Sequence, residues 1–446
     1  MRRGFRSRDP PRAPDSRRLR CGSDRNRSAR RPEPGPRARR PESRARAQLE
    51  PWEGPSEAST GRLPRQSGRP LEKLQCLVQN AGSKPRTRRG AMQAIVYHGK
   101  EDFRYERTSD PKLESESDSI IRVSRTAICG SDLHLYHGGI PDGIGASGGF
   151  AVGHEFLGVI EEVGRGVRGF KKGDRVLASC TVGCGDCALC RRGVYSGCLT
   201  MTKGGGAGNV FGFSPSLPGG QAEAVRVPFS DTNLFRVPAQ LSDEQALFLT
   251  DILPTGYMGA ELAEVSPGDT VVVFGCGPVG TFAQMSAFLR GAARVIAVDL
   301  DDERLARARA RGCDTVNSSR ENLGERVLAL TDGLGADASI EAVGRSELIT
   351  QAAMVTRAGG RIAVIGVLTE ATATLPWFLL FMKNLSLRTG LVNPQCHIPR
   401  LLPLIEQGRL DPTVIISHRL PLSDGPRGYD VFAHHKENVL KVVLQP

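Results

Sequence analysis

The feature that most limits the folds open to this chain is a cluster of glycines between an apolar run and a helical pattern. Gly275, Gly277 and Gly280 form GCGPVG directly after the β-branched run 270–274. The first glycine permits a tight turn, the second lets the backbone approach a pyrophosphate, and the third lets the helix pack closely on the strand. Free N–H groups at the helix N-terminus favour an anion there. The pattern therefore predicts a strand–turn–helix unit that binds a dinucleotide.

A second predicted strand supplies an acidic partner for this turn. The run RVIAVD (294–299) ends in Asp299, which lies 24 positions after Gly275, near the spacing expected for an acid that binds a ribose. A carboxylate there accepts from a 2′-hydroxyl and repels a 2′-phosphate, so the sequence favours NAD over NADP. The alternative to a dinucleotide site is a glycine turn used only for packing and a solvated Asp299. Arg294 and Arg304 lie nearby in the sequence and could tolerate the 2′-phosphate of NADP.

Four cysteines in one short loop predict a metal site. They have the spacing C-x2-C-x2-C-x7-C and are Cys184, Cys187, Cys190 and Cys198. Four thiolates at such spacing fit a closed tetrahedral zinc site, which is structural because it leaves no position open. Free thiols or disulfides are the alternative, but cysteines in one loop are poorly placed to link distant parts of the chain. Cys180 lies four residues before this loop and is interpreted as a bystander.

Composition and pattern divide the chain into four segments. Residues 1–91 contain 12 prolines and 25 Lys and Arg against 9 Asp and Glu, whereas the other 355 residues carry 35 basic and 39 acidic side chains. Short β-rich runs fill 92–254, strands alternate with helical stretches over 255–388, and mixed short elements follow over 389–446. We therefore expect an α/β protein that combines a mostly β domain with a doubly wound parallel sheet.

The basic segment 1–91 predicts a disordered extension, because it has no periodic apolar pattern to offset its ordering entropy. Such an extension has no function or reflects a start assigned upstream of Met92. A transit peptide and a nucleic-acid or membrane arm are the alternatives; nine acidic residues weaken the first and the scarcity of aromatic residues weakens the second. The folded part has no basic excess that would attract nucleic acid. Its most apolar run, 375–387, is too short and too polar to cross a membrane.

Four further residues offer metal ligands but lie far apart in the sequence: Cys129, His154, Glu155 and Asp251. Spacing alone does not join them, because a single cysteine or a single buried histidine more often belongs to a core than to a metal site. From the residues alone, a second metal site remains one of two open interpretations.

Five short motifs resemble those of zinc-dependent alcohol dehydrogenases of the medium-chain family. In chain order they are CGSDLH, GHEFLGVIEEVG, GDRV, CGDCALCRRGVYSGC and GPVG, and the resemblance extends from Met92 to Pro446. The stretches DILPTGYMGAELA and HIPRLLPLIEQGRLDP are similar to the branch that holds formaldehyde, threonine, butanediol and secondary-alcohol dehydrogenases. The resemblance implies a GroES-like, mostly β catalytic domain whose segments flank a Rossmann domain.

The same resemblance implies a catalytic zinc held by Cys129, His154 and Asp251, with Glu155 as a fourth or exchanging ligand. Asp251 departs from the liver-type pattern, in which a cysteine is the third protein ligand. A hard oxygen in place of a soft thiolate leaves the zinc a stronger Lewis acid.

Further roles are implied for residues around this zinc and along the cofactor. Ser131 resembles the hydroxyl that accepts the substrate proton, which passes through the cofactor ribose to His134 and solvent. The alternatives are a Ser131 that only caps a turn and a His134 that lies on the surface beside His137. The implied cofactor contacts, from the pyrophosphate through the adenosine to the nicotinamide, are Val279, Arg304, Ile365, Gly366 and Val367.

These features predict an oxidoreductase that transfers a hydride between NAD and an alcohol, giving an aldehyde or ketone, with one catalytic and one structural zinc per chain. A glutathione-independent formaldehyde dehydrogenase or a polyol, threonine or butanediol dehydrogenase is the alternative within this class. The alternative from another class is a non-catalytic protein that binds metal and nucleotide. We expect no nucleic-acid or membrane partner and a reducing, cytoplasmic compartment. The resemblance implies a dimer or tetramer of identical chains.

Overall fold

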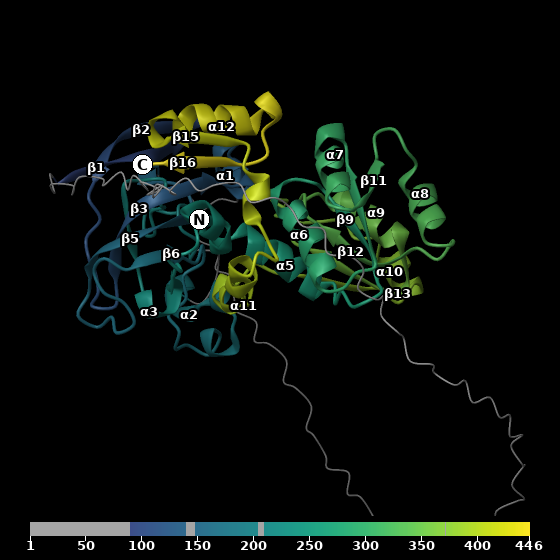
Figure 1. The fold of residues 1–446 in the computed structure, drawn as a ribbon, viewed down its shortest axis with the longest axis horizontal. Helices are drawn as coiled ribbons and strands as arrows, with labels where there is room; N and C mark the ends of the chain where they lie inside the picture. Colours follow the sequence, from purple (N-terminus) through teal and green to yellow (C-terminus); the bar gives the residue numbers. More distant parts are fainter. Residues whose placement is uncertain (1–89, 140–147, 204–208, 371) are drawn as a thin grey trace, which may run out of the picture. The chain divides into compact units, whose positions relative to one another are not determined.

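The computed structural model describes residues 90–139, 148–203, 209–370 and 372–446. The disordered extension expected over 1–91 lies outside the described residues apart from its last two, and strand β1 already begins at Ala91. The described chain forms two sheets in a mostly β part and one wholly parallel sheet (Figure 1). This confirms the expected combination of a GroES-like part with a Rossmann fold.

The mostly β part is built around a seven-stranded sheet in the order β15-β16-β3-β5-β6-β8, with β7 beside β3, and a three-stranded sheet in the order β2-β1-β4. β3 and β5 pair antiparallel and bury most of their apolar side chains, as expected for β-branched runs that line a core. The elements before the parallel sheet are β1 (Ala91–Gly99), β2 (Asp102–Ser109), β3 (Ser119–Ile128), α1 (Gly130–Tyr136), β4 (Phe150–Ala151), β5 (Glu155–Val163), β6 (Arg175–Ala178), η1 (Cys190–Arg192), η2 (Tyr195–Gly197), α2 (Leu199–Thr202), β7 (Ala224–Val227), α3 (Ser230–Asn233), β8 (Leu234–Arg236), α4 (Asp243–Leu247) and η3 (Phe248–Thr250).

The chain returns to this part after the parallel sheet, and Figure 1 shows α12, β15 and β16 in yellow beside the blue strands β1 to β3. β16 pairs antiparallel with β3, so that Val442 lies opposite Ile128. The apolar run 439–444 enters the sheet only at Val442, because the N–H groups of Leu440 and Lys441 donate to the Ser417 hydroxyl instead. The returning elements are α11 (Pro394–Glu406), η4 (Pro412–Ile415), β15 (His418–Pro421), η5 (Leu422–Asp424), α12 (Gly425–Ala433), η6 (Lys436–Asn438) and β16 (Val442–Gln445).

The parallel sheet has the strand order β11-β10-β9-β12-β13-β14, with the chain reversing its direction of progress at β9. Alternate residues of β9 enter two separate apolar clusters, Val271 and Val273 one and Val272 and Phe274 the other, so both faces of the sheet are buried. Its elements are α5 (Ile252–Leu262), β9 (Thr270–Phe274), α6 (Pro278–Leu289), β10 (Arg294–Asp299), α7 (Asp302–Ala310), β11 (Asp314–Asn317), α8 (Leu323–Leu330), β12 (Ala336–Glu341), α9 (Ser346–Val355), β13 (Thr356–Val364), α10 (Trp377–Met382) and β14 (Ser386–Thr389).

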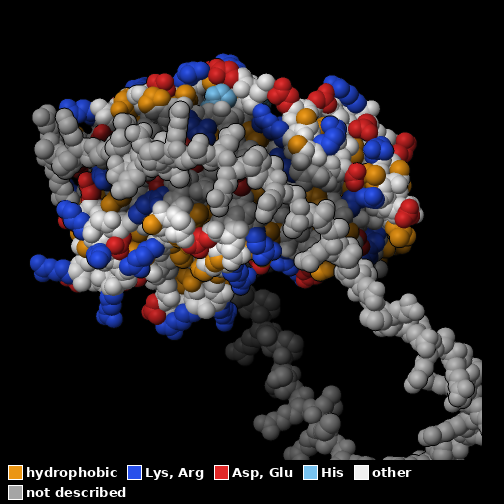
Figure 2. Space-filling model, viewed as in Figure 1, with side chains coloured by type: hydrophobic (Ala, Val, Ile, Leu, Met, Phe, Trp, Pro, Cys, Tyr) orange, Lys and Arg blue, Asp and Glu red, His pale blue; other side chains and the backbone are white. Residues whose placement is uncertain are grey.

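None of the helices in the four described ranges is both long enough and apolar enough to span a bilayer. On the face in Figure 2, basic and acidic side chains are interspersed over the described surface, as expected from the near balance of charge after residue 91.

Candidate active site

Four buried side chains from three separate segments meet in the mostly β part. Cys129 follows β3, His154 directly precedes β5 and Glu155 opens it, and Asp251 directly precedes α5. One ligand atom from each lies within 4.8 Å of all the others, and all four residues are buried. Nε2 of His154 is 3.2 Å and Sγ of Cys129 is 3.5 Å from Oδ2 of Asp251. The fold thus joins the residues that spacing alone could not.

The chemistry of this cluster, which we call the Cys129 cluster, fits a divalent metal ion. Burial raises the pKa of Cys129 to about 11, so its thiolate needs a nearby cation. Oε2 of Glu155 is buried and has no hydrogen-bond partner among the described residues. One sulfur, one imidazole nitrogen and carboxylate oxygens are the ligand types that zinc takes in sites with an open position.

Asp132 supports the imidazole of this cluster and was missed in the sequence. Its Oδ1 lies 3.0 Å from Nδ1 of His154, on the side of the ring away from Asp251. Its Oδ2 accepts from the backbone N–H of Cys129 at 2.9 Å and from Nε2 of Gln221 at 3.3 Å. The contact lacks hydrogen-bond geometry at Nδ1, but a carboxylate at this distance favours a proton on Nδ1, which leaves Nε2 free to bind a metal. The signal in the sequence was its place in CGSD, three residues after the cysteine.

A buried ion pair lies behind the carboxylate of Glu155. Nζ of Lys441 is 2.7 Å from Oε1 of Glu155, and both residues have no exposed surface. Burial alone would lower the pKa of Lys441, but the Glu155 carboxylate raises it above its ordinary value. The ion pair occupies Oε1 of Glu155, whereas Oε2 has no hydrogen-bond partner among the described residues.

Cys180 belongs to this site and not to the neighbourhood of the four-cysteine loop. Its Sγ donates to Oδ1 of Asp251 at 3.4 Å, and the Thr255 hydroxyl contacts the same oxygen at 3.2 Å. Burial raises the pKa of Cys180 well above its ordinary value. Cys180 is not part of the four-sulfur group, as its interpretation as a bystander to that loop predicts. Its place beside Asp251 was not predicted.

The two residues expected to move a proton lie on α1. Oγ of Ser131 is 3.1 Å from Nε2 of His154, so Ser131 borders the cluster. His134 lies one turn later on the same helix face and is partly buried, which lowers its pKa. The structure thus brings Ser131 to the cluster and places His134 farther along the helix.

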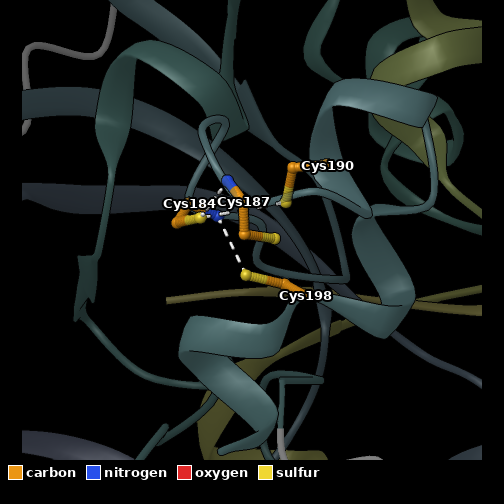
Figure 3. A group of neighbouring side chains, drawn as sticks. All are labelled: Cys184, Cys187, Cys190 and Cys198. Carbon is orange, nitrogen blue, oxygen red and sulfur yellow. Dashed lines mark hydrogen bonds between the residues drawn. The ribbon is translucent and has the colours of Figure 1, made fainter. Parts of the chain in front are cut away.

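The four-cysteine loop gathers its sulfur atoms, and Figure 3 shows the side chains of Cys184, Cys187, Cys190 and Cys198 pointing toward one another. Their sulfur atoms lie within 4.8 Å of one another. Backbone N–H groups of Cys184 and Cys187 donate to Cys198 and Cys184 sulfurs at 3.2 and 3.3 Å. Hydrogen bonding, above all from Cys190, lowers the pKa of Cys187 to about 6, which favours the thiolate. The arrangement fits a closed four-sulfur zinc site.

The glycine turn follows β9 and leads into α6, as expected. Gly275 has φ of +91°, a conformation that favours glycine, and a side chain at Gly280 would collide with the carbonyl oxygen of Gly275. At Gly277, which caps α6, an added Cβ would meet open space. Val279 is in the first turn of α6. Open space at the helix N-terminus fits a pyrophosphate.

Asp299 ties the end of β10 to this turn. Its Oδ2 accepts from the N–H of Cys276 at 2.7 Å, and its Oδ1 accepts from the N–H groups of Leu300 and Asp301 at 2.7 and 3.0 Å. Arg304, on α7, contacts Nδ1 of His435 at 3.1 Å. The carboxylate is therefore held beside the glycine turn, where a ribose would lie next to a bound pyrophosphate.

The residues expected beside a nicotinamide follow β13 at the same end of the parallel sheet. The N–H groups of Ile365 and Gly366 donate to the carbonyl of Glu341 at 2.9 and 3.1 Å. Ile365 is buried against α5, where a side chain at Gly259 would collide with it, and Val367 is 47% exposed. Ile365 thus also serves the core, whereas Val367 is available to a ligand.

Comparisons with known proteins agree with both parts of the fold. The family model of an alcohol dehydrogenase GroES-like domain matches residues 115–239, and that of a zinc-binding dehydrogenase matches residues 278–407. The chain is 38% identical to the uncharacterized zinc-type alcohol dehydrogenase-like protein AdhB of Bacillus subtilis, over 80% of this chain and 100% of that one. It is 40% identical to the solved alcohol dehydrogenase TADH from Thermus sp. ATN1, with a TM-score of 0.73, over 79% of this chain and 99% of that one.

Two less similar solved structures, each 26% identical with a TM-score of 0.70 over 80% of this chain, hold different cofactors. A zinc-binding dehydrogenase from Sinorhizobium meliloti is bound to NADP over a match of 99% of its chain, and rspB from E. coli is complexed with NADH over 100% of its chain. Relatives therefore occur with both nicotinamide cofactors. From its two matched domains and its identity to zinc-type relatives along their whole length, the chain belongs to the zinc-dependent medium-chain alcohol dehydrogenase family and is an oxidoreductase.

Proposed function

We propose that this protein oxidises a primary or secondary alcohol to an aldehyde or ketone, or catalyses the reverse reduction, with NAD as the hydride carrier. The observation that carries the proposal is the Cys129 cluster, in which four buried ligand residues converge within 4.8 Å and one carboxylate oxygen has no partner among the described residues. The glycine turn of the same chain offers a helix N-terminus to a pyrophosphate.

The residues around the cluster have distinct tasks in this proposal. Cys129, His154 and Asp251 would hold a zinc ion, whose Lewis acidity would lower the pKa of an alcohol as it does that of water. Ser131 accepts the alcohol proton, and His134 passes it toward solvent. A nicotinamide cofactor held at the glycine turn would supply the hydride acceptor, so that oxidation of the alcohol by two electrons would be balanced by reduction of NAD.

We infer NAD as the cofactor from Asp299. Its negative charge repels a 2′-phosphate and its oxygens accept from ribose hydroxyls. Arg304, one of the two arginines that could tolerate a phosphate, contacts His435 at 3.1 Å. Steady-state rates with NAD and NADP test this inference, and a preference for NADP would refute it.

Metal content and turnover test the proposed activity together. The full chain purified with zinc is expected to hold two zinc ions and to reduce NAD with at least one of a panel of primary alcohols, secondary alcohols and polyols. Cys129→Ala should abolish the activity and remove one zinc. The control Cys396→Ala removes a half-buried thiol outside both clusters. This variant should keep the activity and both zinc ions. A chain that binds zinc and NAD but oxidises no alcohol would instead support a non-catalytic binding protein.

We propose that the protein forms dimers or tetramers through the β14 edge of the parallel sheet. β14 ends this sheet in the described part of the chain, and α10, which precedes it, exposes Trp377, Phe378 and Phe381 by 69–75%. A large apolar surface beside a free strand edge favours association, and a two-fold axis lets a second copy cover it with the same surface. Phe378→Glu is expected to shift the sedimenting species toward the monomer; a monomeric wild-type chain would refute the proposal.

We also propose a cytoplasmic location. All nine cysteines in the described part are free thiols. Five of them belong to the two candidate metal groups. Thiolates must stay reduced to bind metal, which a reducing compartment ensures. Fractionation of cells that make the protein tests this location.

A further inference from the structure

The two carboxylate oxygens of Asp251 have different neighbours. Oδ2 lies 3.2 Å from Nε2 of His154 and 3.5 Å from Sγ of Cys129, the distances between atoms that share one ion. Oδ1 points the other way, toward Sγ of Cys180 at 3.4 Å and Oγ1 of Thr255 at 3.2 Å. Only one oxygen of the carboxylate therefore belongs to the ligand cluster.

Cys180 is held firmly enough to orient this carboxylate. Its backbone N–H donates to the carbonyl of Thr250 at 2.9 Å, and its carbonyl accepts from Phe211 at 3.2 Å. Its side chain is 2% exposed. The Thr255 hydroxyl has a second acceptor, the carbonyl of Asp251 at 3.0 Å, as expected four residues along a helix. Because that hydroxyl has a single proton to donate, the thiol of Cys180 is the donor always available to Oδ1.

We propose that Cys180 is a positioning residue that keeps Asp251 a one-oxygen metal ligand and so leaves a coordination position open for the substrate oxygen. The proposal rests on the proposed metal site. A carboxylate can bind a cation through one or both oxygens. With its outer oxygen engaged by Cys180, Asp251 presents the inner one alone.

The chemical consequence concerns the number of ligands at the ion. A catalytic zinc site has three protein ligands and one open position. When the thiol is removed, Oδ1 loses a donor and Asp251 can turn both oxygens toward the ion, where the second oxygen competes with the substrate. Losing a residue that holds a metal ligand in place typically lowers metal affinity or activity about 10- to 100-fold. Because S–H is a weak donor, we expect the loss of Cys180 to have an effect near the lower end of this range.

The test uses cobalt as a visible reporter in the full chain. Zinc is left in the four-cysteine loop, the ion of the Cys129 cluster is removed by a chelator and replaced by cobalt, and one zinc and one cobalt per chain are verified. The variants are Cys180→Ala and Cys180→Ser, with Cys396→Ala as a matched loss of a thiol outside both clusters. The measurements are the visible spectrum, the cobalt affinity, and KM for alcohol and for NAD.

Cys180→Ala is expected to weaken the visible bands, as four-coordinate cobalt gains a fifth ligand, and to lower cobalt affinity or kcat/KM about tenfold. KM should rise for the alcohol and stay unchanged for NAD. Cys180→Ser retains a hydroxyl donor and is expected to keep the wild-type spectrum, as is Cys396→Ala.

Two results would overturn the inference while leaving the proposed function intact. One is a Cys180→Ala chain with wild-type spectrum, affinity and KM. The other is a loss of sulfur-to-cobalt charge-transfer intensity in both Cys180 variants, which would make Cys180 a ligand itself. A wild-type chain that takes up no cobalt at the Cys129 cluster would refute the proposed metal site, and the inference with it.

Discussion

Replacing Lys441 by Met separates the charge of a fully buried side chain from its packing. The Lys441 ammonium lies 2.7 Å from Glu155 and 5.8 Å from the ring centre of Phe248, and neither Lys441 nor Glu155 is exposed to solvent. Met is similar in length and fills the same space, so Lys441→Met removes mainly the charge. The Glu155 carboxylate then remains buried without its counter-ion.

The size of the effect follows from that burial. Breaking a buried ion pair by removing one partner costs about 3–5 kcal/mol, because the remaining charge is uncompensated. The ammonium also faces an aromatic ring, an interaction worth about 0.5–2 kcal/mol. We therefore expect Lys441→Met to lower the free energy of unfolding by about 4 kcal/mol, near the middle of the first range.

Denaturant unfolding of chains with zinc in the four-cysteine loop and no metal at the Cys129 cluster, with metal content checked for each variant, measures this loss. The matched control is Lys436→Met, whose partner Asp430 is 2.8 Å away in an ion pair about half exposed on both sides; a pair of this kind contributes at most about 1 kcal/mol. The double variant Lys441→Met/Glu155→Leu removes both charges and should recover most of the loss. The reasoning would be refuted if Lys441→Met were no less stable than Lys436→Met. It would also be refuted if the double variant lost as much stability as the single variants Lys441→Met and Glu155→Leu together.

Three further predictions concern other parts of the chain. Cys187→Ala should leave one zinc per chain and destabilise the fold, since a closed site contributes to folding. The control Cys396→Ala should keep two zinc ions, and metal analysis with thermal unfolding measures both effects. Asp299→Ala should weaken NAD binding about tenfold, for the loss of a hydrogen bond to a charged group, and shift the NADP/NAD preference toward NADP; equal loss for both cofactors would contradict the assigned role. A hydrogen bond with His397 holds the pKa of Glu261 below its ordinary value of 4.5. The ionised Glu261 therefore stabilises the folded state above pH 4.5, by about 0.5–1 kcal/mol after solvent screening, and this contribution is lost as the pH falls through the lowered pKa. Glu261→Gln should flatten that acid limb of the stability profile, and an unchanged acid limb would show that the pair does not cause it.

Much of the parallel sheet could be predicted because its signals are local. The apolar runs 270–274 and 294–299 are bounded by turn residues, and each forms a strand in the structure. The glycine turn and the four-cysteine loop are equally local, since each requires only residues adjacent in sequence. The end of the chain was harder to predict. Two N–H groups of the apolar run 439–444 donate to the Ser417 hydroxyl and not to a neighbouring strand, and the sequence of the run does not indicate this contact.

The Cys129 cluster shows where local patterns stop being informative. Its ligands come from three segments that only the fold brings together, so they were grouped through a family resemblance and not through spacing. Lys441 was missed because one lysine in an apolar run looks like a solvent-facing strand residue, whereas it is buried and paired. The contact of Cys180 with Asp251 was missed because its nearest neighbours in sequence belong to the four-cysteine loop.

The antiparallel pairing of β16 with β3 sets the order in which this protein matures during synthesis. β3 leads directly to Cys129, and the chain just before β16 supplies Lys441. Both β16 and Lys441 leave the ribosome only after every strand of the parallel sheet. Domains generally fold as units while the chain is being made, so the dinucleotide-binding sheet can fold while the ligand cluster still lacks the neighbour of Glu155. Nascent chains arrested before β16 should thus acquire a protease-resistant nucleotide-binding core before they can retain a metal ion.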